Sequence, residues 1–188
     1  MSTLASKTPL VWESAPGSYA MFLPPDMSSL GPFREELKRS LKVNNFSLEN
    51  IMQIELAADE ALTNSIAASA SSLSEETIIC RWHINNEKFK LYVLDYGAGI
   101  KETSQTEPKC LSTMIESIRN YQLKKTEALT FNGKVVKHNN MGKGLKIIRA
   151  LMDSVKIMFH GDGAVSESDC GFKVMGSILA LEYDRAKH

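Results

Sequence analysis

The sequence contains little cysteine. Its 188 residues include three cysteines, Cys80, Cys110 and Cys170, which are odd in number, lie far apart and form no C-x-x-C pair. This spacing argues against the disulfide framework of a small secreted domain and against the paired thiols of a zinc knuckle. Inert thiols in a reducing compartment are the simplest interpretation.

An excess of one charge and long hydrophobic runs are also missing. The 22 basic and 22 acidic residues cancel to a formal net charge of zero, whereas a nucleic-acid-binding domain usually carries a basic excess. No run approaches the roughly 18 apolar residues that span a membrane, and the N-terminal residues lack the pattern of a secretory signal. We therefore expect one cytoplasmic globular domain that binds neither nucleic acid nor a membrane directly.

What the sequence does contain is a series of short apolar patterns. Residues 1–18 are polar and include proline, so we predict a flexible N-terminal arm followed by a single domain over residues 19–188. Residues 19–23 form an apolar run that ends at two prolines, as suits an edge strand. Apolar side chains then recur at the spacing of an amphipathic helix, at Leu30, Phe33, Leu37 and Leu41.

A longer helix and a β-hairpin are predicted next. Ser47 can cap the helix, which then carries apolar residues on one broad face as far as Ile66. Residues 77–84 and 88–95 read as two strands, and the two asparagines between them favour a tight turn.

The second half of the chain is less regular. Residues 100–141 are weakly patterned, with one amphipathic helix expected at 111–121, and such a long insertion is often a lid over a site. Residues 142–152 predict a helix, and residues 155–159 and 173–183 predict strands. Strands joined by hairpins, with helices grouped between them, indicate an α+β two-layer sandwich in which helices cover one face of a mixed, mostly antiparallel sheet.

The first pair of residues that suggests chemistry is Glu60 and Asn64. The helical period places them one turn apart on the same side of the second predicted helix, at the border of its apolar stripe. A carboxylate and a carboxamide there would suit Mg²⁺ or an attacking hydroxyl. Two solvated surface groups are the more common explanation, because E-x-x-x-N often occurs by chance.

The second is the segment from Asp95 to Gly99, D-Y-G-A-G. Strand alternation places Asp95 on the core-facing side, where a carboxylate needs a hydrogen-bond partner. The exocyclic amine of a base is such a partner, and Gly97 and Gly99 would let the backbone approach it closely. A plain turn explains the same residues equally well.

The third is Gly142-Lys143-Gly144, at the start of a predicted helix. Glycines there expose backbone N–H groups and the positive end of the helix dipole to an anion, and Lys143 adds a cation. A hinge of the lid is an equally good interpretation.

In this order, the three motifs resemble the N, G1 and G2 boxes of the GHKL (Bergerat) ATPases. The segments EALTNSI, LDYGAGI and MGKGLKIIRALMDSV are especially similar to those of the bacterial anti-sigma-factor serine/threonine kinases, and the likeness covers roughly residues 19–183. The resemblance implies the Bergerat fold, an ATP lid at about 100–141, and an ATP- and Mg²⁺-dependent protein kinase.

The resemblance also implies a role for each site residue. Glu60 would be the general base that orients the attacking hydroxyl, and Asn64 would hold the Mg²⁺ that bridges the phosphates. Asp95 would bind the adenine amine. The other ATP-binding positions would be Gly97 and Gly99 at the pocket floor, Gly142, Lys143 and Gly144 at the lid, and Ser177 near the adenine.

Three departures from the family pattern bear on activity. The chain has Ala67–Ser69 in place of the His-Gly step that often follows the N box, and the loop over residues 160–171 is longer than usual. Asn140 stands where the family has an arginine before the G2 glycines. Because phosphoryl transfer depends on cationic stabilisation of the transferring group, this last change bears on turnover rather than on nucleotide binding.

Two hypotheses for the function follow from the resemblance. In the first, the protein is a kinase that phosphorylates an anti-sigma antagonist of the STAS type and sequesters a sigma factor, and so regulates transcription. In the second, it is a non-catalytic module that binds these partners under the control of nucleotide.

The related kinases form homodimers. Apolar side chains that could form such a surface here are those of Phe22, Leu23, Phe33 and Leu37. A place in the core explains these residues as well.

Overall fold

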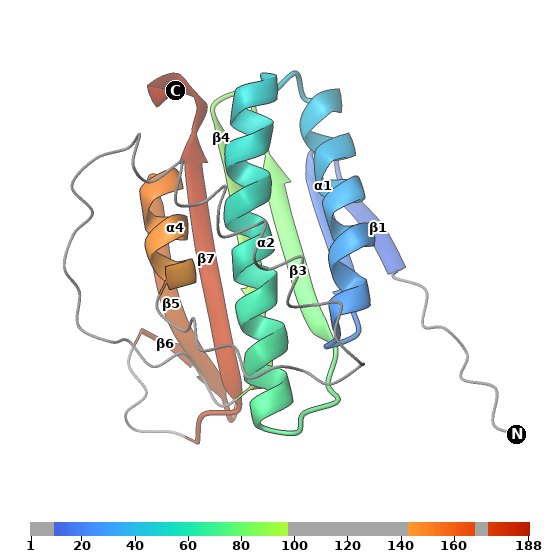
Figure 1. The fold of residues 1–188 in the computed structure, drawn as a ribbon, viewed down its shortest axis with the longest axis vertical. Coiled ribbons are helices and arrows are strands. Elements are labelled where there is room, and N and C mark those ends of the chain that lie inside the picture. Colours follow the sequence, from blue (N-terminus) through green and yellow to red (C-terminus); the bar gives the residue numbers. More distant parts are fainter. Residues whose placement is uncertain (1–9, 98–142, 168–172) are drawn as a thin grey trace, which may run out of the picture.

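The domain has two layers, with a seven-stranded sheet in one and helices on one face of it in the other (Figure 1). The structure is a computed structural model that describes residues 10–97, 143–167 and 173–188. This architecture confirms the predicted α+β sandwich. In chain order, the elements are β1 (Leu10–Ala15), β2 (Ser18–Leu23), the 3₁₀ helix η1 (Met27–Ser29), α1 (Leu30–Val43), α2 (Leu48–Ser71), β3 (Ile78–Ile84), β4 (Lys88–Leu94), α4 (Lys143–Leu151), β5 (Ser154–Gly161), β6 (Ala164–Ser166), β7 (Gly176–Asp184) and the 3₁₀ helix η2 (Arg185–Lys187).

The strand order in the sheet is β1-β2-β3-β4-β7-β5-β6. Every pairing between the described strands is antiparallel, so the expectation of a mixed sheet is corrected in this detail. Strand β7 follows all the other described strands in the chain, yet it lies between β4 and β5 (Figure 1). This insertion places the start of β7 beside the end of β4, where the candidate site lies.

The N-terminal prediction needs a correction. A flexible arm was expected over residues 1–18, whereas residues 10–15 form β1 and pair with β2. The turn between the two strands depends on Gly17, whose φ of 75° is costly for other residues. The Gly17 carbonyl also accepts a hydrogen bond from the Ile84 N–H at 2.7 Å, which fastens this turn to β3.

The helices begin and pack as their sequences predict. The Ser47 side chain accepts a hydrogen bond from the Asn50 N–H at 3.1 Å and so caps α2. Three of the four apolar residues considered for a homodimer surface are fully buried in the core, namely Leu23, Phe33 and Leu37. Only Phe22 keeps partial exposure. None of the helices in the described ranges has the length and hydropathy needed to cross a bilayer.

The second half contains one strand that the sequence patterns did not predict. Residues 164–166 form β6, joined to β5 by a tight turn at Asp162 and Gly163, which both have positive φ. Asp-Gly is a strong signal for such a turn, but these residues were interpreted as part of the loop over residues 160–171. The predicted lid at about 100–141 and its helix at 111–121 lie outside the described residues.

The cysteine of β3 is part of the hydrophobic core. Cys80 is fully buried in β3, and burial raises the pKa of its thiol well above the usual range, as expected for an inert cysteine.

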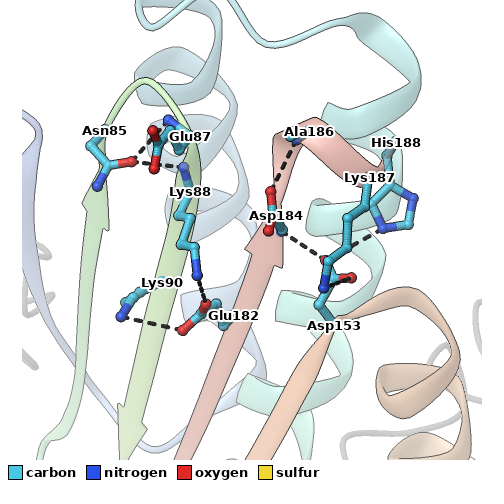
Figure 2. Close-up of polar contacts among 10 residues, drawn as sticks. All are labelled: Asn85, Glu87, Lys88, Lys90, Asp153, Glu182, Asp184, Ala186, Lys187 and His188. Atoms are coloured by element: carbon cyan, nitrogen blue, oxygen red, sulfur yellow. Dashed lines mark hydrogen bonds and ion pairs between the residues drawn. The ribbon is translucent and has the colours of Figure 1, made fainter.

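Polar contacts surround the C-terminal end of β7 (Figure 2). The Glu182 carboxylate accepts a hydrogen bond from the Lys88 ammonium at 2.6 Å and lies 3.2 Å from the Lys90 ammonium. The Asp153 carboxylate accepts the backbone N–H of Asp184 at 2.7 Å. These contacts link the end of β7 to β4 and to Asp153, the residue just before β5.

Tyr183 predicts a loss of stability at alkaline pH. Its ring is fully buried and its hydroxyl donates to Gln53 at 3.1 Å. Burial, together with Asp153 and Glu49, raises its pKa from 10.0 to about 12. The Tyr183 hydroxyl therefore loses its proton at a lower pH in the unfolded chain than in the folded one. As a result, the free energy of unfolding should fall as pH rises from about 10 toward 12, by on the order of 1 kcal/mol.

Denaturant unfolding of wild type and Tyr183→Phe at several alkaline pH values measures this effect. The Phe variant should show a shallower dependence on pH than wild type. Tyr92→Phe is the matched control, because Tyr92 is 41% exposed and its replacement should leave the slope unchanged. Equal slopes for Tyr183→Phe and wild type would show that Tyr183 does not cause the alkaline loss of stability.

Candidate functional site

The candidate site forms where β4 ends and β7 begins. Antiparallel pairing matches Leu94 with Ile178, and one residue further the Asp95 N–H donates to the Ser177 carbonyl at 2.9 Å. Asp95 continues the alternation of Leu91 and Val93, whose side chains are buried in the core. Its own side chain is therefore on the helix-covered side of the sheet, and the residue is only 1% exposed.

The Asp95 carboxylate is held by donors from both sides. Its Oδ2 accepts the Ser177 hydroxyl at 2.9 Å, and its Oδ1 accepts the Gly97 N–H at 2.9 Å. The Ser177 N–H lies at the longer distance of 3.4 Å from Oδ1. A carboxylate offers about four acceptor positions, so Asp95 can still accept a hydrogen bond from a ligand such as an exocyclic amine.

Gly97 brings the turn after Asp95 against α2. A Cβ at this position would lie 2.5 Å from the backbone carbon and the Cβ of Ala68. Glycine is therefore required by the close packing of this turn on the helix. The Ala68 position, where the family resemblance indicated a departure, is occupied by a residue small enough to permit this contact. Gly99 lies outside the described residues.

The same helix meets the third motif one to two turns earlier. A Cβ on Gly144 would lie 2.8 Å from the Glu60 Oε2 and 3.2 Å from the Asn64 Nδ2. Glu60 is 3% exposed and Asn64 is half-buried. The interpretation of Glu60 and Asn64 as two solvated surface groups is therefore wrong for Glu60. Gly142 lies outside the described residues, as does the side chain of Lys143, although Lys143 begins α4.

Helix α2 thus brings the three sequence motifs together. Its middle carries Glu60 and Asn64 against the start of α4, and its later turns carry Ala68 against Gly97. The first turn of α4 presents backbone N–H groups without helical partners and the positive end of the dipole, which favour an anion. A buried carboxylate with the capacity to accept from a base therefore lies near one part of α2, and a helix start of the kind that favours anions lies near another.

One residue near Asp95 was missed. His160, at the end of β5, places its Nε2 2.7 Å from the Asp95 carbonyl oxygen, and its ring packs edge-on against Tyr96 at 5.0 Å. Its position depends on the pairing of β5 with β7, which no local pattern reveals.

Comparison with known families agrees with this geometry. The model of the histidine kinase-like ATPase domain matches residues 23–165, well over half of the chain. The chain belongs to this family. The description of this family implies an ATP-binding domain with kinase- or ATPase-like activity. The comparison with curated proteins found no match. Ser177, which contacts Asp95, lies beyond the matched range of this ATPase domain.

Substitution of Gly144 should weaken ATP binding by this domain without unfolding it. A methyl group in Gly144→Ala would push Glu60 or Asn64 away from the start of α4, because its Cβ would lie 2.8 Å from the Glu60 carboxylate. We expect about tenfold weaker binding of Mg-ATP with a small change in stability, measured by calorimetry and thermal unfolding. Gly31→Ala is the control, since a Cβ there meets nothing within 4 Å. Equal affinities of Gly144→Ala and wild type would contradict this geometry.

Proposed function

We propose that this domain is an ATP- and Mg²⁺-dependent serine/threonine protein kinase that acts on an anti-sigma antagonist of the STAS type. Through that antagonist and its own binding of a sigma factor, it would regulate transcription by partner switching. The observation that carries the proposal is the approach of Gly144 to Glu60 and Asn64. It places a buried carboxylate next to a helix start that suits phosphate groups.

The residues at both ends of the site fit Mg-ATP. Asp95 is an acceptor-only group that retains capacity for the amine of adenine. At the other end, the Asn64 carboxamide oxygen is a ligand of the type that Mg²⁺ accepts, and a partly exposed position leaves room for the waters that Mg²⁺ usually keeps. Bound Mg²⁺ would neutralise negative charge on the phosphates.

Glu60 would act on the protein substrate. Its carboxylate would accept a hydrogen bond from the attacking serine or threonine hydroxyl, orient that oxygen toward the terminal phosphate, and take its proton as the new P–O bond forms. The bond from the terminal phosphorus to the bridging oxygen would break at the same time, and ADP would leave with its electron pair. Glu60 is only 3% exposed, and Gly144 of α4 lies close to its carboxylate. A buried, fixed base loses little freedom when the hydroxyl arrives, so positioning supports the transfer.

A non-catalytic, nucleotide-gated binding module is the second candidate. The same burial of Glu60 favours it, because a carboxylate with so little exposed surface is less accessible to a hydroxyl on another protein. In that case, bound ATP would order the site and the surface that captures the sigma factor or antagonist, without phosphate transfer.

One experiment separates these functions. The protein is incubated with γ-labelled ATP, Mg²⁺ and purified STAS-type antagonists, and label on the antagonist is measured alongside capture of antagonist and sigma factor. Transfer that disappears in Glu60→Ala supports the kinase. Capture that requires ATP, with no transfer by wild type above the Glu60→Ala background, supports the binding module. Absence of both transfer and nucleotide-dependent capture would overturn both proposals.

A further inference from the structure

His160 reaches Asp95 from the other face of the sheet. The register of β5 and β7 pairs His160 with Gly176, whereas Ser177, on the opposite face, faces the Asp95 carboxylate. The His160 Nε2 nevertheless lies 2.7 Å from the Asp95 carbonyl oxygen. Because a carbonyl can only accept, Nε2 carries the proton and donates it.

This reach requires glycine at position 176. A Cβ on Gly176 would clash with the Asp95 carbonyl oxygen and would lie 2.6 Å from the His160 Nε2. Further contacts hold both the ring and the backbone of His160 in place. Its ring packs edge-on against Tyr96, and the backbone carbonyl of His160 accepts the Met175 N–H at 2.8 Å. The contact is therefore built by residues from three segments.

The bond completes the fixation of Asp95. The Asp95 N–H is bound by the Ser177 carbonyl, and its carboxylate is bound by the Ser177 hydroxyl and the Gly97 N–H. Ladder pairing between β4 and β7 stops at Leu94, so the Asp95 carbonyl turns to His160 instead. Without a donor there, a carbonyl of a buried residue would lose its partner and the turn through Gly97 would be free to shift.

We propose that His160 is a positioning residue for recognition of the adenine base: from β5, it fixes the Asp95 backbone so that the carboxylate on the opposite face meets the exocyclic amine. This inference rests on the proposed ATP site. It predicts that His160 contributes to discrimination between bases and not only to the strength of nucleotide binding. A small error in the carboxylate position should affect a bond to the amine far more than contacts to the phosphates.

The test compares two nucleotides in two variants. His160→Phe keeps an aromatic ring against Tyr96 but removes the donor, and His160→Gln keeps an N–H donor without the ring. Calorimetry with Mg²⁺ gives the dissociation constants of ATP and of inosine triphosphate, which carries an oxo group in place of the amine. We expect wild type to prefer ATP, His160→Phe to lose about tenfold of this preference, and His160→Gln to regain part of it.

The outcomes separate this inference from the function on which it rests. If wild type fails to bind ATP or does not prefer it, the proposed site itself is wrong. If wild type prefers ATP and folded His160→Phe keeps the same ratio of dissociation constants, His160 has only a structural role and the inference is overturned. Should His160→Phe fail to fold, His160→Gln is compared with His160→Asn, whose shorter side chain cannot place its amide against the Asp95 carbonyl. A ratio of dissociation constants for ATP and inosine triphosphate in His160→Asn equal to that of wild type would overturn the inference.

Discussion

Asp95→Asn should lower the affinity for ATP by about two orders of magnitude, the largest effect on binding that we expect from one substitution. The change keeps the shape of the side chain but replaces one carboxylate oxygen with an NH₂ donor. In place of Oδ1, that NH₂ group would oppose the Gly97 N–H, and in place of Oδ2 it would require the Ser177 hydroxyl to turn and accept, so one oxygen is left to accept from both the protein and the amine. The remaining oxygen cannot serve the protein and an amine equally well.

Calorimetric titration of Asp95→Asn with Mg-ATP measures this loss. Thermal unfolding without nucleotide shows whether the variant remains folded, and added ATP should no longer raise its melting temperature. Asp162→Asn is the matched control, because this aspartate lies in the exposed turn before β6, where asparagine also tolerates the positive φ. Unchanged affinity in folded Asp95→Asn would overturn the assignment of the base site.

Glu60→Gln should have the opposite profile, with phosphate transfer lowered by about 10²- to 10⁴-fold and ATP affinity changed little. Glutamine is nearly the same size, so it preserves the contact with Gly144, whose Cβ position lies 2.8 Å from the Glu60 Oε2. What it lacks is the ability to take a proton from the attacking hydroxyl. The expected loss therefore falls on the chemical step.

Single-turnover transfer of labelled phosphate, with binding measured in parallel, separates the two effects. Glu55→Gln is the control, because Glu55 lies on the same helix but pairs with Arg34 and Lys38 of α1, away from the site. If transfer in Glu60→Gln equals that of wild type, Glu60 is not the base. If ATP binding falls as steeply as transfer, its role is in binding instead.

Features that depend on neighbours in the chain were predicted well. The Ser47 cap, the apolar stripe of α1 and the hairpin between β3 and β4 each depend on residues a few positions apart, and the structure confirms them. The burial of Asp95 followed from strand alternation in the same way. Local patterns therefore predicted the two-layer fold and the burial of Asp95.

Features that depend on distant pairing were not predictable in this way. The contact of Asp95 with His160 spans 65 residues and requires β5 to lie beside β7. Strand β1 was missed because its pairing is with β2 across a turn that includes a proline and Gly17, a combination that also occurs in loose segments. The short β6 depends on an Asp-Gly turn whose significance is clear only once β5 is recognised beside it.

The position of β7 also has a consequence for how the protein is made. A ribosome completes β4 and β5 before β7 exists, so both nascent strands expose unpaired backbone groups at the edges that β7 will later join. Contacts between such distant segments form slowly, and exposed strand edges promote aggregation. Because Ser177 arrives with the same strand, the emerging chain should be unable to use nucleotide as a folding aid, and its demand for chaperones should be greatest just before β7 is synthesised.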